Sequence, residues 1–162
     1  MVFETQTRRR AILIFTLDRS GVLNKIAMLI RRKMQNVDTI TACSTLQPGI
    51  SRITITLRED SDDKMLQVTK QIEKVTEVIS ARELDIDQSF WREVAIVKFE
   101  ADGAHLAKLG KSHAFEILDR QNNEVCVAQV AGTSLMIDSF MQEIGEEKII
   151  DVARSGFTAL EK

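Results

Sequence analysis

The sequence is poor in the features that mark several classes of protein. Its 162 residues include only two cysteines, Cys43 and Cys126, which lie far apart, so neither a disulfide framework nor a structural zinc site is indicated and a reducing compartment is expected. The net charge of -2 provides no general positive field, which argues against a nucleic-acid binder. The longest apolar run, Ala11–Phe15, is far too short to span a membrane, and Met1–Arg10 holds no stretch of signal-peptide length. We therefore expect a soluble, cytoplasmic protein with neither nucleic acid nor membrane as a partner.

The motifs of catalytic and cofactor-binding sites are also missing. Neither a G-x-G-x-x-G nor a G-x-x-x-x-G-K-[ST] sequence is present, so no phosphate cradle is indicated. His105 and His113 have no carboxylate or cysteine at ligand spacing, which makes a metal site improbable. A nucleophile pair between Cys126 and either histidine stays open, but no nucleophile motif surrounds Cys126 and a packed strand cysteine is the better interpretation. We expect no catalytic residue, metal or cofactor in this chain.

The apolar fraction of 44% and the charged fraction of 28% are those of a folded globular protein. In its first half, apolar spacing and turn residues predict strand, helix, strand, strand, helix, strand over Arg10–Ile86, which is a split βαβ, ferredoxin-like order. The alternation of Ile53–Leu57 predicts one buried and one solvent-facing side. Asp60–Asp63 supplies an N-cap and an acidic first turn for the second helix. The predicted elements are strands at Ala11–Phe15, Val37–Thr45, Ile50–Leu57 and Val78–Ile86, and helices at Val22–Met34 and from Asp60 onward.

The second half repeats this order with a shorter first helix. Ala95–Phe99 echoes Ala11–Phe15, and Ile150–Arg154 echoes Val78–Arg82, which makes a duplication plausible. The sequence therefore predicts an α+β protein of two ferredoxin-like βαββαβ domains, over residues 9–87 and 92–158. An exposed strand such as Ile53–Leu57 tends to be buried by association in domains this small, so we expect a homodimer.

The turn Asp18-Arg-Ser-Gly21 carries the most chemical content, because it places a helix N-terminus directly after a buried strand. Exposed N–H groups there attract a carboxylate, and Gly21 lets a ligand approach the backbone. Ser20 or Asp18 could instead cap the helix. On spacing alone, an ordinary capped turn is the favoured interpretation.

Four short segments of the first half resemble the ACT domain of acetolactate synthase small subunits. They are Arg10-Ala-Ile-Leu-Ile14, Ser20-Gly-Val-Leu23, Asn36-Val37 and Ser51-Arg-Ile-Thr-Ile55. ACT domains accompany many amino-acid enzymes and regulators, so these segments alone are weak evidence.

Three segments of the second half resemble that family's C-terminal domain, and they are more specific. They occur in the family's order and extend the resemblance over roughly Arg9–Gly156. They are Arg92-Glu-Val-Ala-Ile-Val-Lys98, Gln129-Val-Ala-Gly-Thr-Ser134 and Val152-Ala-Arg-Ser-Gly156.

The resemblance implies a non-catalytic regulatory subunit whose ACT domain senses a branched-chain amino acid, usually valine. It implies a homodimer with joined ACT sheets and an effector bound between the first loop of one chain and the second strand of its neighbour. The catalytic large subunit, which this chain would activate, would carry thiamine diphosphate, Mg²⁺ and FAD. Carried over to this sequence, the effector-binding residues are Asp18, Ser20, Gly21, Val22, Asn36, Val37 and Cys43.

Two residues depart from the family pattern. Asp18 stands where the family commonly has asparagine, and its charge would favour the effector's ammonium group but repel its carboxylate. Met34 stands where the family usually has glycine, which predicts a differently shaped turn after the helix. Two other functions stay open, a free-standing ACT-type sensor acting on another enzyme or on transcription, and a small enzyme using Cys126 or a histidine.

Overall fold

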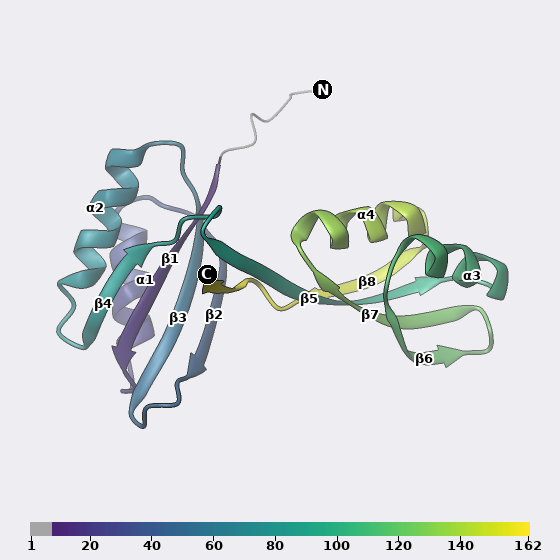
Figure 1. Ribbon diagram of the computed structural model, residues 1–162, viewed down its shortest axis with the longest axis horizontal. Helices are drawn as coiled ribbons and strands as arrows, with labels where there is room; N and C mark the ends of the chain where they lie inside the picture. Colours follow the sequence, from purple (N-terminus) through teal and green to yellow (C-terminus); the bar gives the residue numbers. More distant parts are fainter. Residues whose placement is uncertain (1–7) are drawn as a thin grey trace. The chain divides into compact units, whose positions relative to one another are not determined.

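The computed structural model describes residues 8–162, so residues 1–7, which hold most of the segment searched for a signal peptide, lie outside the described residues. The chain folds into two compact units (Figure 1). One contains the chain up to Phe90 together with Ala159–Lys162, and the other contains Trp91–Thr158. Each unit has the order strand, helix, strand, strand, helix, strand, which confirms the predicted α+β fold of two ferredoxin-like domains. The domain boundaries 9–87 and 92–158 stay a prediction.

In the first unit, one antiparallel sheet in the order β2-β3-β1-β4 packs against two helices. Its core contains Ile12 and Ile14 of the sheet, Ile26 and Ile30 of the first helix and Ile72 of the second. The elements are β1 (Arg9–Leu17), α1 (Val22–Arg32), β2 (Val37–Ser44), β3 (Ile50–Arg58), α2 (Asp62–Glu73) and β4 (Val78–Glu83).

Local sequence signals place the ends of these elements. Ser61 caps α2, because its side chain accepts a hydrogen bond from the Lys64 N–H, and Asp62 and Asp63 lie in the first turn, as predicted. Gly49 adopts φ 77° in the turn between β2 and β3, a conformation that glycine reaches without steric cost.

The predicted solvent-facing side of β3 is wrong, because Thr54 and Thr56 are buried together with the apolar residues between them. β3 lies between β2 and β1, and the Thr56 hydroxyl is 2.6 Å from that of Thr39 on β2. The chain's last residues also return to this side, where Arg52 donates a hydrogen bond to the Ala159 carbonyl. The side of β3 that carries Thr54 and Thr56 is therefore covered, like the side that carries its isoleucines.

The sheet of the second unit has the order β6-β7-β5-β8. The last strand, β9, pairs with β5, and its residues from Ala159 onward belong to the first unit. Its core joins Val97 and Phe99 of β5 to Leu109 and Phe140 of the two helices. The elements are β5 (Ser89–Glu100), α3 (Gly103–Ser112), β6 (Glu116–Gln121), β7 (Val125–Gly132), α4 (Ser134–Ile144), the short helix η1 (Glu146–Lys148), β8 (Ile149–Arg154) and β9 (Thr158–Glu161).

The predicted sequence echo between the halves is out of register by one residue. On β1 the core side holds Ile12 and Ile14, whereas on β5 it holds Ala95 and Val97. Ile12 pairs with Glu83 in the same way that Ala95 pairs with Arg154, and the pairing of both strands shifts four residues later. Ala95 is thus equivalent to Ile12 rather than to Ala11, because the side of the sheet and the pairing decide equivalence.

Candidate functional site

The loop between β1 and α1 is held at its start by two backbone hydrogen bonds. The Leu17 N–H donates to the Glu77 carbonyl at 2.8 Å, and the Asp18 N–H donates to the Gly49 carbonyl at 2.8 Å. These bonds tie the loop to the α2–β4 connection and to the β2–β3 turn. The end of β1 and the start of the loop are therefore fixed by their neighbours.

Neither Ser20 nor Asp18 caps α1, which corrects that prediction. Gly21 is the N-cap with φ 84°, and no side chain accepts a hydrogen bond from the first turn. A Cβ built on Gly21 would meet no atom within 4 Å, so the space in front of the helix is open. The Val22 N–H makes a long hydrogen bond of 3.4 Å to the Arg19 carbonyl. The other N–H groups of the first turn have no carbonyl partner within the helix, and such groups suit a carboxylate.

The acidic side chains near the start of α1 are Asp18 of the loop and Glu77. α1 has no acidic residue in its first turn. Lys25 forms an ion pair with Glu77, and their hydrogen bond is the main reason that the pKa of Glu77 lies below its usual value. The Asp18 carboxylate has no hydrogen bond or ion pair within residues 8–162. The Asp18 carboxylate is therefore available to bind an ammonium group.

The other expected effector residues lie elsewhere in the unit. Asn36 and Val37 follow α1, whose 11 residues place them on the order of 16 Å along the helix from Gly21. Cys43 is exposed near the end of the edge strand β2. Its row across the sheet contains Arg52 and Phe15, so Cys43 lies at the same end of the sheet as the Asp18 loop. A single chain therefore brings Asp18, Ser20, Gly21 and Val22 together and leaves Asn36 and Val37 at the other end of α1.

The turn before Asn36 contains a residue in the left-handed conformation, Met34. α1 ends at Arg32, and Met34 adopts φ 57° with its side chain 92% exposed. A β-carbon makes this conformation costly, which is why glycine is common at such helix ends. Methionine at this position therefore strains the turn before Asn36.

The second unit contains no Cys–His nucleophile pair. Cys126 is fully buried in the core, where desolvation raises the pKa of its thiol above the usual value. His113 instead contacts Glu143 of α4 at 2.9 Å, and His105 Nε2 lies 3.5 Å from the Glu143 carbonyl. Across residues 8–162, no group of three or more His, Cys, Asp and Glu side chains is placed to hold a metal ion. None of the helices in that range is long and apolar enough to cross a membrane.

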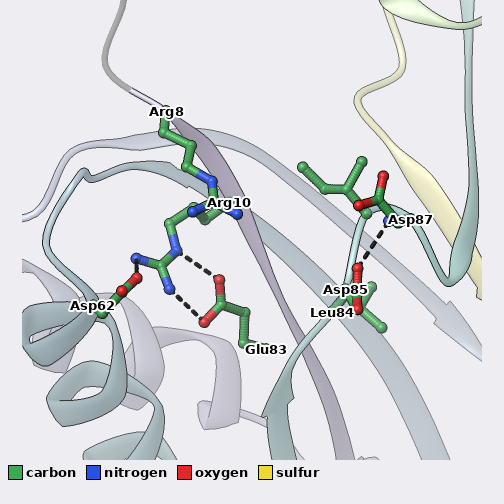
Figure 2. A pocket seen from close by; sticks show the side chains of 8 residues that line it. Arg8, Arg10, Asp62, Glu83, Leu84, Asp85 and Asp87 are labelled. Atoms are coloured by element: carbon green, nitrogen blue, oxygen red, sulfur yellow. Dashed lines mark hydrogen bonds and ion pairs between the residues drawn. The ribbon is translucent and has the colours of Figure 1, made fainter.

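Sequence reasoning missed a buried arginine beside a hollow at the edge of the first unit (Figure 2). Arg10 makes two hydrogen bonds to Glu83, of 2.5 and 2.7 Å, and these are the main reason that its pKa is raised further. The sequence did not single out Arg10, because Arg8, Arg9 and Arg10 are consecutive. Only the ion pair with Glu83 on β4 distinguishes it.

Comparison with known proteins covers both units. The model of the AHAS small subunit-like ACT domain matches residues 12–80, and that of the small subunit of acetolactate synthase matches residues 92–162. The chain is 30% identical over 159 residues to the acetolactate synthase isozyme 3 small subunit of Escherichia coli, covering 95% of this chain and 96% of that protein. It is 33% identical over 147 residues to a probable acetolactate synthase small subunit of Methanothermobacter thermautotrophicus, covering 88% and 86%.

A solved structure agrees with this match in fold. The acetolactate synthase small subunit from Thermotoga maritima superposes with a TM-score of 0.86 at 24% identity, over 96% of this chain and 98% of that chain. The matches to the two family models follow one another along the chain, one in each unit for most of its length. The chain therefore belongs to the family of acetolactate synthase small subunits, the non-catalytic regulatory subunits of that enzyme.

Proposed function

We propose that this chain activates a catalytic acetolactate synthase large subunit and mediates its feedback inhibition by valine or a related branched-chain amino acid. The observation that carries the proposal is the uncapped start of α1 at Gly21, which opens onto empty space. A helix N-terminus free of side-chain caps and acids can accept the carboxylate of an amino acid. The effector-sensing domain is residues 9–87, followed by the C-terminal domain 92–158.

The chain acts as a homodimer through β2. β2 lies at the edge of its sheet and has an unpaired side that can accept another strand. If β2 pairs antiparallel with β2 of a second copy about its midpoint, Val37 of one copy lies opposite Ser44 of the other. Ser44 is in the same cross-strand row as Ser51 and Thr16, immediately before the Asp18 loop. Dimerisation would thus supply the residues that one chain holds apart.

Each expected site residue then has a role. The backbone of Ser20, Gly21 and Val22 binds the effector carboxylate, and the Asp18 side chain binds its ammonium group. Asn36 and Val37 come from the second copy and close the site, with Cys43 facing the same pocket. The negative charge of Asp18 strengthens the contact with the ammonium group and weakens carboxylate binding. The balance of these two effects sets the affinity.

The chemistry belongs to the catalytic partner, which would carry thiamine diphosphate, Mg²⁺ and FAD. This chain would bind none of these groups and would act in the cytoplasm. Its contribution is a coupling free energy between the effector site and the partner's active site.

The test is acetolactate formation by a cognate large subunit with and without this chain. We expect several-fold higher activity when the chain is added, and a fall when valine, leucine or isoleucine is titrated in. Calorimetric titration of the chain alone with the same three amino acids would identify the effector. Amino-acid binding without any change in synthase activity would favour a free-standing ACT-type sensor and contradict the proposal.

A further inference from the structure

Both units contain a buried ion pair that joins the first strand of the sheet to the last. In the first unit, Arg10 on β1 binds Glu83 on β4, and its Nη1 atom lies 2.7 Å from Asp62 at the start of α2 (Figure 2). The Arg10 side chain is 7% exposed, whereas that of Glu83 is 34% exposed. The first-strand residue is thus the deeply buried member of the pair.

The second unit repeats this arrangement with the charges exchanged. Arg154 on β8 binds Glu93 on β5 through two guanidinium nitrogens, and its Nη1 atom lies 2.7 Å from Asp138 on α4. The Glu93 side chain is 2% exposed and that of Arg154 is 30% exposed. The first-strand residue is again the buried one, but here it is the anion.

The two pairs occupy equivalent positions. Arg10 lies two residues before Ile12, which pairs with Glu83, and Glu93 lies two residues before Ala95, which pairs with Arg154. Both first-strand residues therefore point to the same side of their sheets as the core residues that follow. Glu83 and Arg154 are equivalent in the same way on the closing strands.

The closing strands otherwise resemble each other. β4 reads Val-Ile-Ser-Ala-Arg-Glu and β8 reads Ile-Ile-Asp-Val-Ala-Arg, and each ends the strand order of its sheet, beside a first strand with an apolar core side. If β4 paired with β5, Glu83 would meet the buried Glu93, and if β8 paired with β1, Arg154 would meet the buried Arg10. A buried charge beside a like charge is strongly unfavourable, so both exchanges carry a penalty that the correct pairings avoid.

We propose that the opposite polarity of the Arg10–Glu83 and Glu93–Arg154 pairs directs each closing strand to its own unit. The polarity acts during folding, when two units of the same plan on one chain offer each closing strand a correct and an incorrect partner. Like charges thereby select against an alternative strand pairing that the apolar pattern permits. The inference is independent of effector binding and of the catalytic partner.

The test compares three full-length proteins that differ only in polarity. All carry Cys43→Ser, Asp62→Asn and Asp138→Asn, so that the helix acids do not oppose an inverted pair. The reference retains both pairs, the singly inverted protein adds Glu93→Arg with Arg154→Glu, and the doubly inverted protein also adds Arg10→Glu with Glu83→Arg. In the singly inverted protein both units have the same polarity, and in the doubly inverted protein the opposite polarity is restored.

Incorrect pairing is measured directly by a disulfide. Lys98 pairs with Asp151 and Phe15 pairs with Ser80, so incorrect pairing of β4 with β5 would place Ser80 opposite Lys98, within reach of a disulfide. Ser80→Cys and Lys98→Cys are added to all three proteins, which are refolded from denaturant and oxidised. The cross-linked peptide is then quantified by mass spectrometry.

We expect the singly inverted protein to give roughly tenfold more Ser80→Cys to Lys98→Cys cross-link than the reference, and the doubly inverted protein to return to the reference level. Equal cross-linking in the reference and singly inverted proteins would overturn the proposal, as would equally high cross-linking in both inverted proteins. If the singly inverted protein does not refold, recovery of folded protein in the doubly inverted one supports the proposal. Failure of both inverted proteins to refold contradicts it.

Discussion

The helix that follows the first strand begins differently in the two units. In the first unit, α1 begins at Gly21 with no side-chain cap. In the second unit, Asp102 caps α3, and its carboxylate accepts a hydrogen bond from the His105 N–H at 2.8 Å. Both helices occupy the same place in the strand, helix, strand, strand, helix, strand order. A side-chain carboxylate therefore already fills, at α3, the place that a ligand carboxylate could take at α1.

This difference separates a structural helix start from one that is available to a ligand. The Asp102 carboxylate satisfies a first-turn N–H group and places a negative charge at the positive end of the helix dipole. Gly21 does neither, so no side chain of the protein takes the N–H groups of this turn, and a side chain added at Gly21 would enter open space. The same fold thus has an uncapped helix start in one unit and a capped one in the other.

The largest expected effect comes from placing a carboxylate at α1. Gly21→Asp should weaken binding of the effector amino acid by roughly 100-fold, because the new charge repels the ligand carboxylate and competes for the N–H groups. Gly103→Asp makes the same change at the start of α3, where a Cβ meets only Arg120 Nη2 at 3.8 Å, and should leave affinity unchanged. Calorimetric titration with the amino acid identified for the unmodified chain measures both.

A further variant separates charge from backbone strain. Gly21→Asn adds a neutral side chain of similar size, and asparagine tolerates the left-handed conformation of this residue. It should therefore bind the effector more tightly than Gly21→Asp. Equal losses in the two variants, or unchanged affinity in Gly21→Asp, would contradict carboxylate binding at this helix start.

Removal of the α3 cap should have a smaller effect, on stability. Asp102→Ala should destabilise the second unit by about 1 kcal/mol, the usual cost of losing an N-cap side chain. Ser20→Ala should leave stability unchanged within about 0.5 kcal/mol, because Ser20 caps nothing in α1. Urea denaturation followed by the fluorescence of Trp91, the sole tryptophan and part of the second unit, measures the first variant.

Hydrogen exchange of the α1 amides measures Ser20→Ala, which changes the other helix. Faster exchange at the start of α1 in that variant would show that Ser20 stabilises the turn in solution. The contrast between capped and uncapped helix starts would then be lost.

The smallest expected effect concerns the turns with positive φ. Met34→Gly should stabilise the first unit by about 0.5–1 kcal/mol, because glycine adopts this conformation without steric cost. Asn123→Gly, at φ 59° in the second unit, should change stability less, since asparagine already tolerates this region. A decrease in stability for Met34→Gly in thermal unfolding would indicate that the exposed methionine makes contacts that outweigh the strain.

Much of the fold was predictable because its signals are local. The spacing of Ile26 and Ile30 gave α1, the Ser61 cap gave the start of α2, and the repeated element order gave two units. The candidate site was partly predictable for the same reason, since Gly21 between a buried strand and a helix marks a turn. Its missing side-chain cap was not predictable, because Ser20 and Asp18 are both residue types that cap helices.

The sequence by itself determined the type and order of the elements, since these follow from apolar periodicity and turn residues within a few positions of each other. Only the tertiary structure decided which sides of the sheets are covered. Thr54 alternates like a surface residue and is buried on a central strand, where it pairs with Leu13 of β1 and Thr41 of β2. The tertiary structure also decided that Arg10 and Glu93, which have opposite charges, occupy equivalent positions. Equivalence depends on pairing between strands more than 50 residues apart, which no local pattern encodes.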